Sequence, residues 1–254
     1  MIAKRPTFAI ALLPLVGVNA PSTQLSIDDT ARLRVGMNAT YHSSSYAADD
    51  GVEVMPQAFF DNNRWYIEGA EAGYYPFKSD QHHLRTGISY DGRSFDHDDA
   101  KTDALRQLDD RQWSANAYAS YMYVSPYGGF KAKVGTDITG RHHGQSVSLS
   151  HLSKFNKEKL TIYPEFGAIW YSKKYNDYYY GISSAESVRS GLNTYQAGSG
   201  VSPFATVTAS YQLNDQISIF GNQRLEWLSS AQKNSPMTDG SLDSKTRLGI
   251  NYQF

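Results

Sequence analysis

The chain ends in SKTRLGINYQF (residues 244–254), where apolar and polar side chains alternate. One set consists of Leu248, Ile250, Tyr252 and Phe254. The other consists of Lys245, Arg247, Gly249, Asn251 and Gln253. Successive side chains of a β-strand point to opposite faces, so this stretch predicts a strand with one apolar face and one polar face. Such a strand can meet lipid on one side and a wet lumen on the other.

The same alternation of period two runs through the chain from about residue 30. It predicts strands near residues 32–42, 52–61, 64–70, 72–78, 82–92, 112–124, 129–139, 145–155, 159–171, 202–213, 216–228 and 244–254. Segment 64–78 is ambiguous, because reading it as one strand gives an odd total. Bacterial single-chain barrels have even strand numbers. Gly69 and Gly73 flank a plausible bend, so we expect about twelve strands, with ten as the alternative.

Short and long connections alternate between these strands. Compact polar turns occur at residues 61–63, 125–128, 156–158 and 214–216, and longer polar stretches at 43–51, 93–110, 172–201 and 229–243. Short turns at one rim and long loops at the other are typical of a closed antiparallel β-barrel in an outer membrane. A secreted β-sandwich is the alternative; it fits less well, because the second face of nearly every strand is polar or small and aromatic residues cluster at strand ends.

Composition excludes several other classes. The chain has 254 residues and no cysteine, which excludes disulfides and thiolate metal sites. Its net charge of -1 excludes the basic surface that is typical of nucleic-acid-binding proteins. No apolar stretch reaches the roughly 18–20 residues that a membrane helix needs. The 19 tyrosines are compatible with membrane–water boundaries, where such side chains are favoured.

The two chain ends carry sorting signals. Lys4 and Arg5 precede a short apolar run, Phe8 to Val18, and Val18-Asn19-Ala20 resembles a cleavage site. We therefore expect a secretory signal peptide at residues 1–20 and a barrel at 21–254, located in the outer membrane of a Gram-negative bacterium. The terminal Phe254 resembles the signature that the barrel assembly machinery reads.

The longest break in strand periodicity lies at residues 176–200. Ser183 or Ser184 can cap a short helix, Glu186 and Arg189 are spaced to pair at i,i+3, and Gly191 can end the helix in a left-handed conformation. Tyr178, Tyr179, Tyr180 and Gly181 precede it. This loop is predicted either to fold over the barrel mouth and dock a partner, or to plug the barrel with its charges paired internally.

Other polar groups give weaker signals. Asp109, Asp110 and Arg111 predict either a network with Arg85, Lys131 or Lys133, or a solvated rim. His82-His83 and His142-His143 are adjacent and make poor chelates, and Asp96-His97-Asp98-Asp99 lacks the spacing of a calcium loop. We therefore expect no metal site and no cofactor. No spacing of Ser, His and Asp singles out a catalytic triad, so we expect no enzyme activity.

Several motifs resemble one family. They are NDYYYGIS (176–183) continuing into SAESVRSGL (184–192), Tyr195, Gly198, SPF (202–204), LDDR (108–111), NSP (234–236), Asp239 and the closing YQF (252–254). Together they resemble the MipA/OmpV family of MltA-interacting outer-membrane proteins, from about residue 32 to the C-terminus. The resemblance implies a non-catalytic scaffold that bridges a peptidoglycan lytic transglycosylase and a bifunctional penicillin-binding protein.

Two other functions stay open at this point. Tyr-rich outer loops suit a surface adhesin or receptor. A barrel of about twelve strands also permits a narrow solute pore, although Tyr163, Arg85 and Lys131 point to an occluded lumen. The short turns predicted on the periplasmic side leave little surface there for two partner enzymes.

Overall fold

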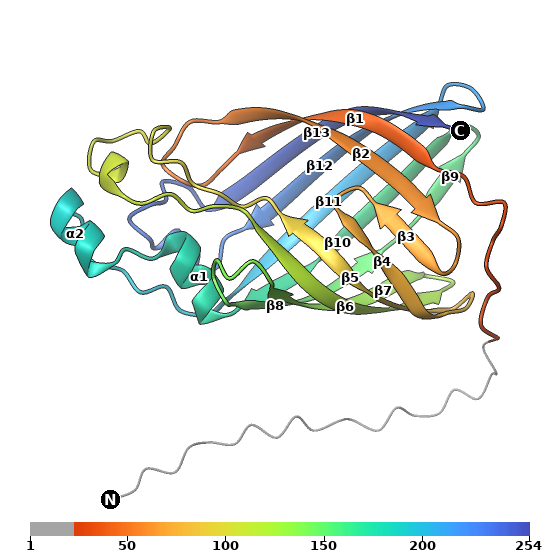
Figure 1. The fold of residues 1–254 in the computed structure, drawn as a ribbon. Coiled ribbons are helices and arrows are strands. Elements are labelled where there is room, and N and C mark those ends of the chain that lie inside the picture. Colours follow the sequence, from red (N-terminus) through yellow and green to blue (C-terminus); the bar gives the residue numbers. More distant parts are fainter. Residues whose placement is uncertain (1–22) are drawn as a thin grey trace, which may run out of the picture.

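The computed structural model describes residues 23–254 (Figure 1). The predicted signal peptide at residues 1–20 lies outside this part of the chain. The described residues form thirteen strands: β1 Arg34–Ser43, β2 Gly51–Asp61, β3 Trp65–Glu68, β4 Glu71–Lys78, β5 His82–Asp91, β6 Ser114–Ser125, β7 Gly128–Asp137, β8 Gln145–Leu152, β9 Phe155–Lys157, β10 Leu160–Tyr171, β11 Gly200–Gln212, β12 Ile217–Trp227 and β13 Leu242–Gln253. They also form the helices α1 Lys173–Tyr180, α2 Ser184–Ser190 and α3 Ser230–Lys233, and the 3₁₀ turn η1 Leu105–Gln107.

The sheet closes on itself as a barrel. Each strand of the ring pairs antiparallel with the next one along the chain, except that β8 pairs with β10, and β13 pairs with β1 to close the ring. The prediction of about twelve strands is confirmed, because twelve strands form the ring and β9 is an extra one. No helix among residues 23–254 has the length and apolar character needed to cross a membrane.

The extra strand β9 continues the line of β8. Leu152 lies opposite Glu165 and Phe155 opposite Ile162, so both strands keep one register against β10. That register places Pro164 opposite Ser153, whose N–H donates to the Pro164 carbonyl at 2.9 Å. Proline has no N–H to return the bond. The missing donor explains why the ladder is interrupted between β8 and β9.

The predicted split of segment 64–78 is also confirmed. β3 and β4 pair as a hairpin in which Glu68 lies opposite Glu71. The turn is at Gly69 and Ala70, and Gly69 has a φ of 60°, which glycine adopts without a steric penalty. Gly73 takes no part in the bend; it lies in β4 opposite Gly87 of β5.

Apolar side chains face outward and form two aromatic belts. In β13, Leu248 and Ile250 are exposed, whereas Asn251, whose side chain points to the opposite face of the strand, is buried. This confirms the predicted alternation. One belt contains Tyr41, Tyr90, Trp113, Trp170 and Trp227, and the other contains Trp65, Tyr74, Tyr121, Tyr211 and Tyr252. Such belts mark the two membrane–water interfaces of an outer-membrane barrel.

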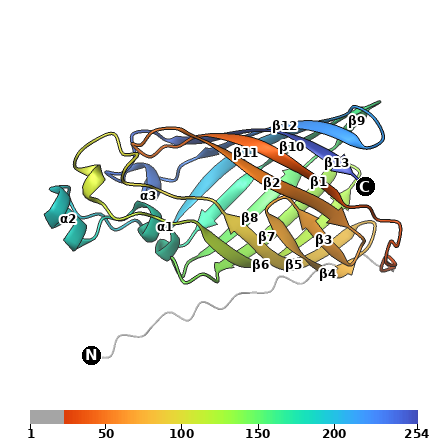
Figure 2. The same cartoon turned by 45° about the horizontal axis from the view of Figure 1, so that its top comes forward.

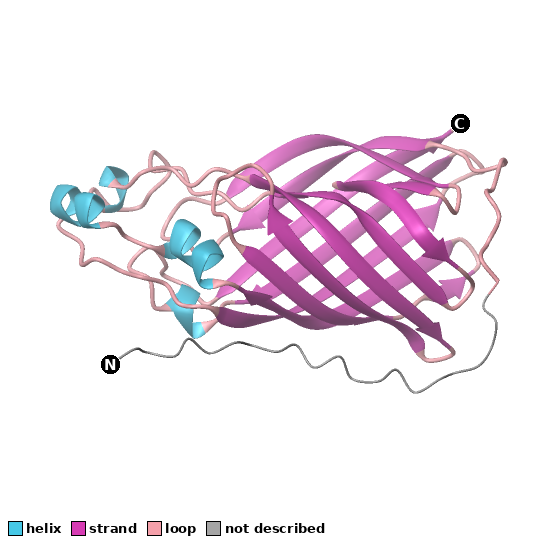
Figure 3. Ribbon diagram, turned by 60° about the horizontal axis from the view of Figure 1, so that its bottom comes forward, coloured by secondary structure: helices cyan, strands magenta, loops and turns pink. Residues whose placement is uncertain are grey.

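The two ends of the barrel differ, as Figures 1 and 3 show. The turn end carries the short connections 62–64, 79–81, 126–127, 158–159 and 213–216 and the C-terminus. The predicted turn at 156–158 is shifted, since Asn156 and Lys157 belong to β9. The loop end carries the connections 44–50, 92–113, 138–144, 172–199 and 228–241, which we call the cap. All of the helices are in the cap (Figure 3).

The described residues form two buried clusters, one at each side of the middle of the barrel. The larger one is in the cap and centres on Tyr46, Tyr175, Tyr179, Tyr180 and Met237, together with Phe95, Leu105, Leu108, Ile182 and Leu228. The smaller one, toward the turn end, consists of Tyr66, Tyr75 and Tyr118. We call this second cluster the tyrosine plug.

Candidate functional site

The tyrosines of segment 176–200 form the core of the cap. Tyr179 and Tyr180 are fully buried on α1, at 0% exposure each. The Tyr46 hydroxyl donates to the Tyr179 carbonyl at 2.9 Å, and the Gln112 N–H donates to the Tyr178 hydroxyl at 3.0 Å. These rings therefore hold the cap loops together and offer little surface to an external partner.

Helix α2 forms as the sequence predicts. The Ser183 hydroxyl accepts from the Glu186 N–H while the Glu186 carboxylate accepts from the Ser183 N–H, which is a capping box. Gly191 ends the helix in a left-handed conformation with φ of 75°. The first turn of α2 is therefore fixed by local sequence.

The predicted pairing of Glu186 with Arg189 is wrong. Glu186 accepts from the guanidinium of Arg111 at 2.7 Å, and both side chains are buried. Arg189 instead donates to Asp109 at 2.7 Å and to the Gln107 carbonyl. Both charged groups of α2 thus point to loop 92–113, because the cap places that loop against the helix.

The structure also corrects the network predicted for Asp109, Asp110 and Arg111. Their partners are Arg189, His97 and Glu186, all in the cap. The three cations that were predicted as partners form ion pairs with other carboxylates. Arg85 pairs with Glu68, Lys131 with Glu165 and Lys133 with Glu71. Loop 92–113 stays at the loop end, whereas these three cations lie on strands within the barrel.

Burial and hydrogen bonding compete at Glu186. Burial opposes ionisation, but the Ser183 N–H, the Arg111 guanidinium and the Asp109 N–H all stabilise the carboxylate. Together they lower the pKa of Glu186 to about 2. Glu186 is therefore an ionised, fully hydrogen-bonded group inside the cap.

The motif segments that lie far apart in the sequence meet in the cap. Ser235 of the 234–236 motif donates to the Tyr180 carbonyl at 2.6 Å. Arg111 of the 108–111 motif donates to the Gly181 carbonyl at 3.0 Å. On α3, the Gln232 side chain donates to Asn176 of α1, and Figure 2 shows these two helices together at the loop end. The motifs therefore build one structural unit.

Arg93, which the sequence analysis did not single out, anchors this unit to the barrel wall. Its guanidinium donates to Asp243 at 2.9 Å and to Glu226 at 3.0 Å, and it also bonds the Tyr175 and Tyr180 hydroxyls. Glu226 and Asp243 lie on inward-facing positions of paired strands. The sequence signal for such a partner is a pair of carboxylates, Glu226 and Asp243, at inward-facing positions near the ends of two adjacent strands.

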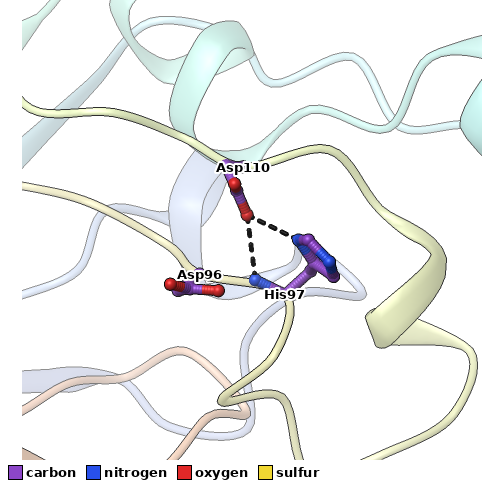
Figure 4. A group of neighbouring side chains, drawn as sticks. All are labelled: Asp96, His97 and Asp110. Atoms are coloured by element: carbon purple, nitrogen blue, oxygen red, sulfur yellow. Dashed lines mark hydrogen bonds and ion pairs between the residues drawn. The ribbon is translucent and has the colours of Figure 1, made fainter.

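Asp96, His97 and Asp110 form a group of potential cation ligands at the surface of the cap (Figure 4). Asp110 already accepts from the His97 ring at 2.7 Å and from the His97 N–H at 3.1 Å. The bond between the ring and the carboxylate raises the pKa of His97 and lowers the pKa of Asp110. The group is a hydrogen-bonded surface pair with one more carboxylate beside it.

Ser114 and His142 are within hydrogen-bond distance, at 3.2 Å. The other ring nitrogen of His142, Nδ1, accepts from the Gly144 N–H at 2.9 Å. In the neutral ring Nε2 then carries the proton and donates to Ser114. A general base needs the opposite arrangement, so this pair is not an activated nucleophile.

A polar cavity of about 580 Å³ lies in the barrel between the cap and the tyrosine plug. Its lining includes the Lys131–Glu165 and Lys133–Glu71 pairs, and Arg224, which pairs with Glu226 at 2.9 Å. Toward the turn end, the Arg85 guanidinium lies 4.7 Å from the centre of the Tyr66 ring. Arg85 and Tyr66 therefore occupy part of the lumen there, and occlusion of the lumen stays a prediction.

Comparisons with known proteins agree on one family. The sequence profile described as MltA-interacting protein MipA matches residues 35–254. The MltA-interacting protein of Escherichia coli (strain K12) is 30% identical over 206 residues, which cover 81% of this chain and 83% of that one. YiaT of the same strain, whose name places it in the outer membrane, is 27% identical over 255 residues and 100% of both chains.

Two solved structures with a similar backbone fold are a porin and an outer membrane channel. An outer membrane channel from Pseudomonas putida F1 has a TM-score of 0.47 and 11% identity, over 94% of this chain and 100% of that one. The NanC porin has a TM-score of 0.46 and 10% identity, over 87% and 100%. Likeness of this degree says nothing about ligands. The profile match spans the whole barrel, and the chain is thus an outer-membrane protein that belongs to the MltA-interacting protein MipA family.

Proposed function

We propose that this protein is a non-catalytic scaffold that holds a lytic transglycosylase at the periplasmic face of the outer membrane, and that it bridges this enzyme to a bifunctional penicillin-binding protein. The observation that carries the proposal is the family match over residues 35–254, together with the name of the relative that interacts with MltA. Anchoring both enzymes at one barrel would couple cutting and synthesis of peptidoglycan.

The turn end offers more surface for a partner than its short turns alone. Segment 23–33 lies across two of these turns: the Leu25 N–H donates to the Lys78 carbonyl at 2.8 Å, and the Asp28 N–H donates to the Asn62 carbonyl at 3.0 Å. Ile27 is 55% exposed on this segment. We call Ile27, Asp28, Asp29, Arg64 and Asp80 the turn-end patch; all five side chains are exposed.

The test is capture of purified lytic transglycosylase by the detergent-solubilised barrel. Ile27→Asp should abolish or strongly reduce capture, because it replaces the exposed apolar side chain of the turn-end patch with a charge. Val188→Asp is the matched control: Val188 is 88% exposed, but it lies on α2 at the opposite end. Equal capture by wild type and Ile27→Asp would contradict docking at this patch, and no capture by wild type would contradict the scaffold itself.

A penicillin-binding protein is tested in the same assay by adding it after the transglycosylase. A ternary complex on the wild-type barrel supports bridging. Mutually exclusive binding of the two enzymes would instead support a role in which the barrel holds one enzyme at a time.

A further inference from the structure

The barrel wall has an opening on its loop side. β2 pairs with β1 from Gly51 to Phe59, but it pairs with β3 only from Phe59 to Asp61. The edge of β2 from Gly51 to Gln57 therefore has no neighbouring strand among the described residues. Figure 1 shows β3 and β4 occupying only the part of the wall nearest to the turn end. We call the space between this edge, the Gly69–Ala70 turn and Tyr90 of β5 the aperture.

The polar cavity reaches through the aperture. Its lining includes inward-facing Met55 and Gln57, but also Pro56 and Tyr90. Pro56 lies opposite outward-facing Met37, and the Tyr90 ring packs at a tilt against Trp113, which is exposed, with ring centres 5.3 Å apart. The cavity is therefore lined by lumen-facing residues and by outward-facing residues, which is the arrangement expected where the lumen meets the surroundings of the barrel. Val52 of the same edge lies opposite Tyr41 of the loop-side aromatic belt, so the connection opens toward the outer leaflet.

The free edge is protected against pairing with another strand. Pro56 lacks an N–H, and proline in sheets is confined largely to edge strands. Glu53 on the same edge is exposed and points inward, which also discourages strand addition. The outward side chains of the free edge, Val52 and Val54, are apolar and more than half exposed. These features fit an apolar chain lying across the edge better than an added peptide strand.

Two strands away from this edge, on β13, the cavity wall carries two cations without a carboxylate partner among the described residues. Lys245 and Arg247 of β13 point inward and line the cavity. Among residues 23–254 neither has a carboxylate oxygen within 4.0 Å, and Arg247 donates to the Thr40 hydroxyl at 3.2 Å. The other lysines and arginines that line the cavity each have a carboxylate partner, and Glu226 is shared by Arg93 and Arg224. Arg247, Thr40 and Glu53 lie in one row across three strands, which puts Arg247 about 10 Å from the free edge.

From this geometry we propose that the cavity binds an anionic amphiphile with a single alkyl chain, which enters from the outer leaflet through the aperture. The carboxylate or phosphate head group lies at Lys245 and Arg247, and the chain leaves between Pro56 and Tyr90. The cap lies over one end of the cavity, and the tyrosine plug lies toward the other end. The head-group charge replaces the missing carboxylate partner of the two cations.

The proposal is tested with the full barrel in phosphatidylcholine nanodiscs and a dodecanoate that carries a photoactivatable diazirine on its chain. Cross-links should map to β2 and the Gly69–Ala70 turn. Unlabelled dodecanoate and dodecyl phosphate, the two head-group chemistries, should each compete, and their relative strengths identify the preferred source. Dodecanol, which is neutral, should compete at least tenfold more weakly.

Three variants separate the parts of the site. Lys245→Gln with Arg247→Gln should weaken dodecanoate binding at least tenfold, and Ala70→Trp should weaken it by obstructing the aperture. Leu149→Trp, on the outward face of β8, is the matched control and should bind as wild type. Heat-modifiable migration in gels confirms that each variant is folded. If dodecanol competes as well as dodecanoate, if the charge variants bind normally, or if cross-links spread evenly around the aromatic belts, the proposal is wrong. Displacement of the probe by a peptide of the β2 sequence would also overturn it in favour of strand addition.

Discussion

The guanidinium of Arg111 and the carboxylate of Glu186 lie 2.7 Å apart, with side chains only 8% and 4% exposed, and they join loop 92–113 to α2. Breaking a buried ion pair by removing one partner typically costs about 3–5 kcal/mol. Arg111→Ala should therefore loosen the cap while the barrel stays intact. Hydrogen exchange of residues 92–113 and 172–199 should become faster, and that of the strands should not change.

Asp103→Ala is the control for this experiment. Asp103 also lies in loop 92–113, but its pair with Arg106 is exposed and 3.6 Å long. Exposed pairs contribute roughly 0–1 kcal/mol, so exchange in the cap should remain as in wild type. Unchanged exchange in Arg111→Ala would show that other contacts are enough to hold the cap.

The stability of the cap should fall in acid. The pKa of Glu186 is lowered from 4.5 to about 2. Because the folded pKa is the lower one, the stabilisation is fully present above pH 4.5 and is lost as pH falls toward 2. At about 1.4 kcal/mol per unit, it amounts to about 3 kcal/mol.

Limited proteolysis of the cap between pH 5 and pH 2 measures this dependence. Glu186→Gln should be cleaved faster at pH 5, because the charged partner of Arg111 is missing, and should change less on acidification. A wild-type cap that resists protease equally at both pH values would contradict the role assigned to this carboxylate.

His97 provides a second titration, at the surface. Its bond to Asp110 raises its pKa above 6.5. Asp110→Asn should therefore return the pKa of His97 toward that value, as measured by NMR of the histidine ring. Asp98→Asn is the comparison, since Asp98 lies 3.5 Å from the ring without a hydrogen bond to it; it should have a smaller effect.

Pro164 should limit the ladder between β8, β9 and β10. The Ser153 N–H donates to the Pro164 carbonyl, but no bond returns. Pro164→Ala supplies that N–H in the same register, and a net backbone hydrogen bond is worth about 0.5–1.5 kcal/mol. We expect the new amide to be protected from exchange and the thermal midpoint to rise. Rapid exchange of the amide that this substitution introduces would show that the strands part at this point for another reason.

The barrel could be predicted from the sequence because its physical signal is local. The alternation of apolar and polar residues along β13 or β6 depends only on which side of the wall each residue faces. It can therefore be read directly from the order of the residues. The capping box at Ser183 and the left-handed Gly191 are local for the same reason. The partners of Glu186 and Arg93 are not local, because they depend on how five loops fold over one another. Arg111 is 75 positions from Glu186, and no periodicity connects them. The aperture could not be predicted from local sequence, because it depends on the lengths of β2 and β3 together.

Phe254 should act in assembly more than in stability. Its ring packs on Tyr252 with centres 5.1 Å apart, but it is 66% exposed, so the folded barrel gains little from it. Phe254→Ser should lower the amount of protein inserted into the outer membrane, while the purified, refolded variant keeps the thermal midpoint of wild type. Phe155→Ser removes a similarly exposed ring at the same end of the barrel and should insert normally. Equal insertion of both variants would mean that the assembly machinery does not read the terminal residue, and a lowered midpoint for Phe254→Ser would assign the ring a structural role instead.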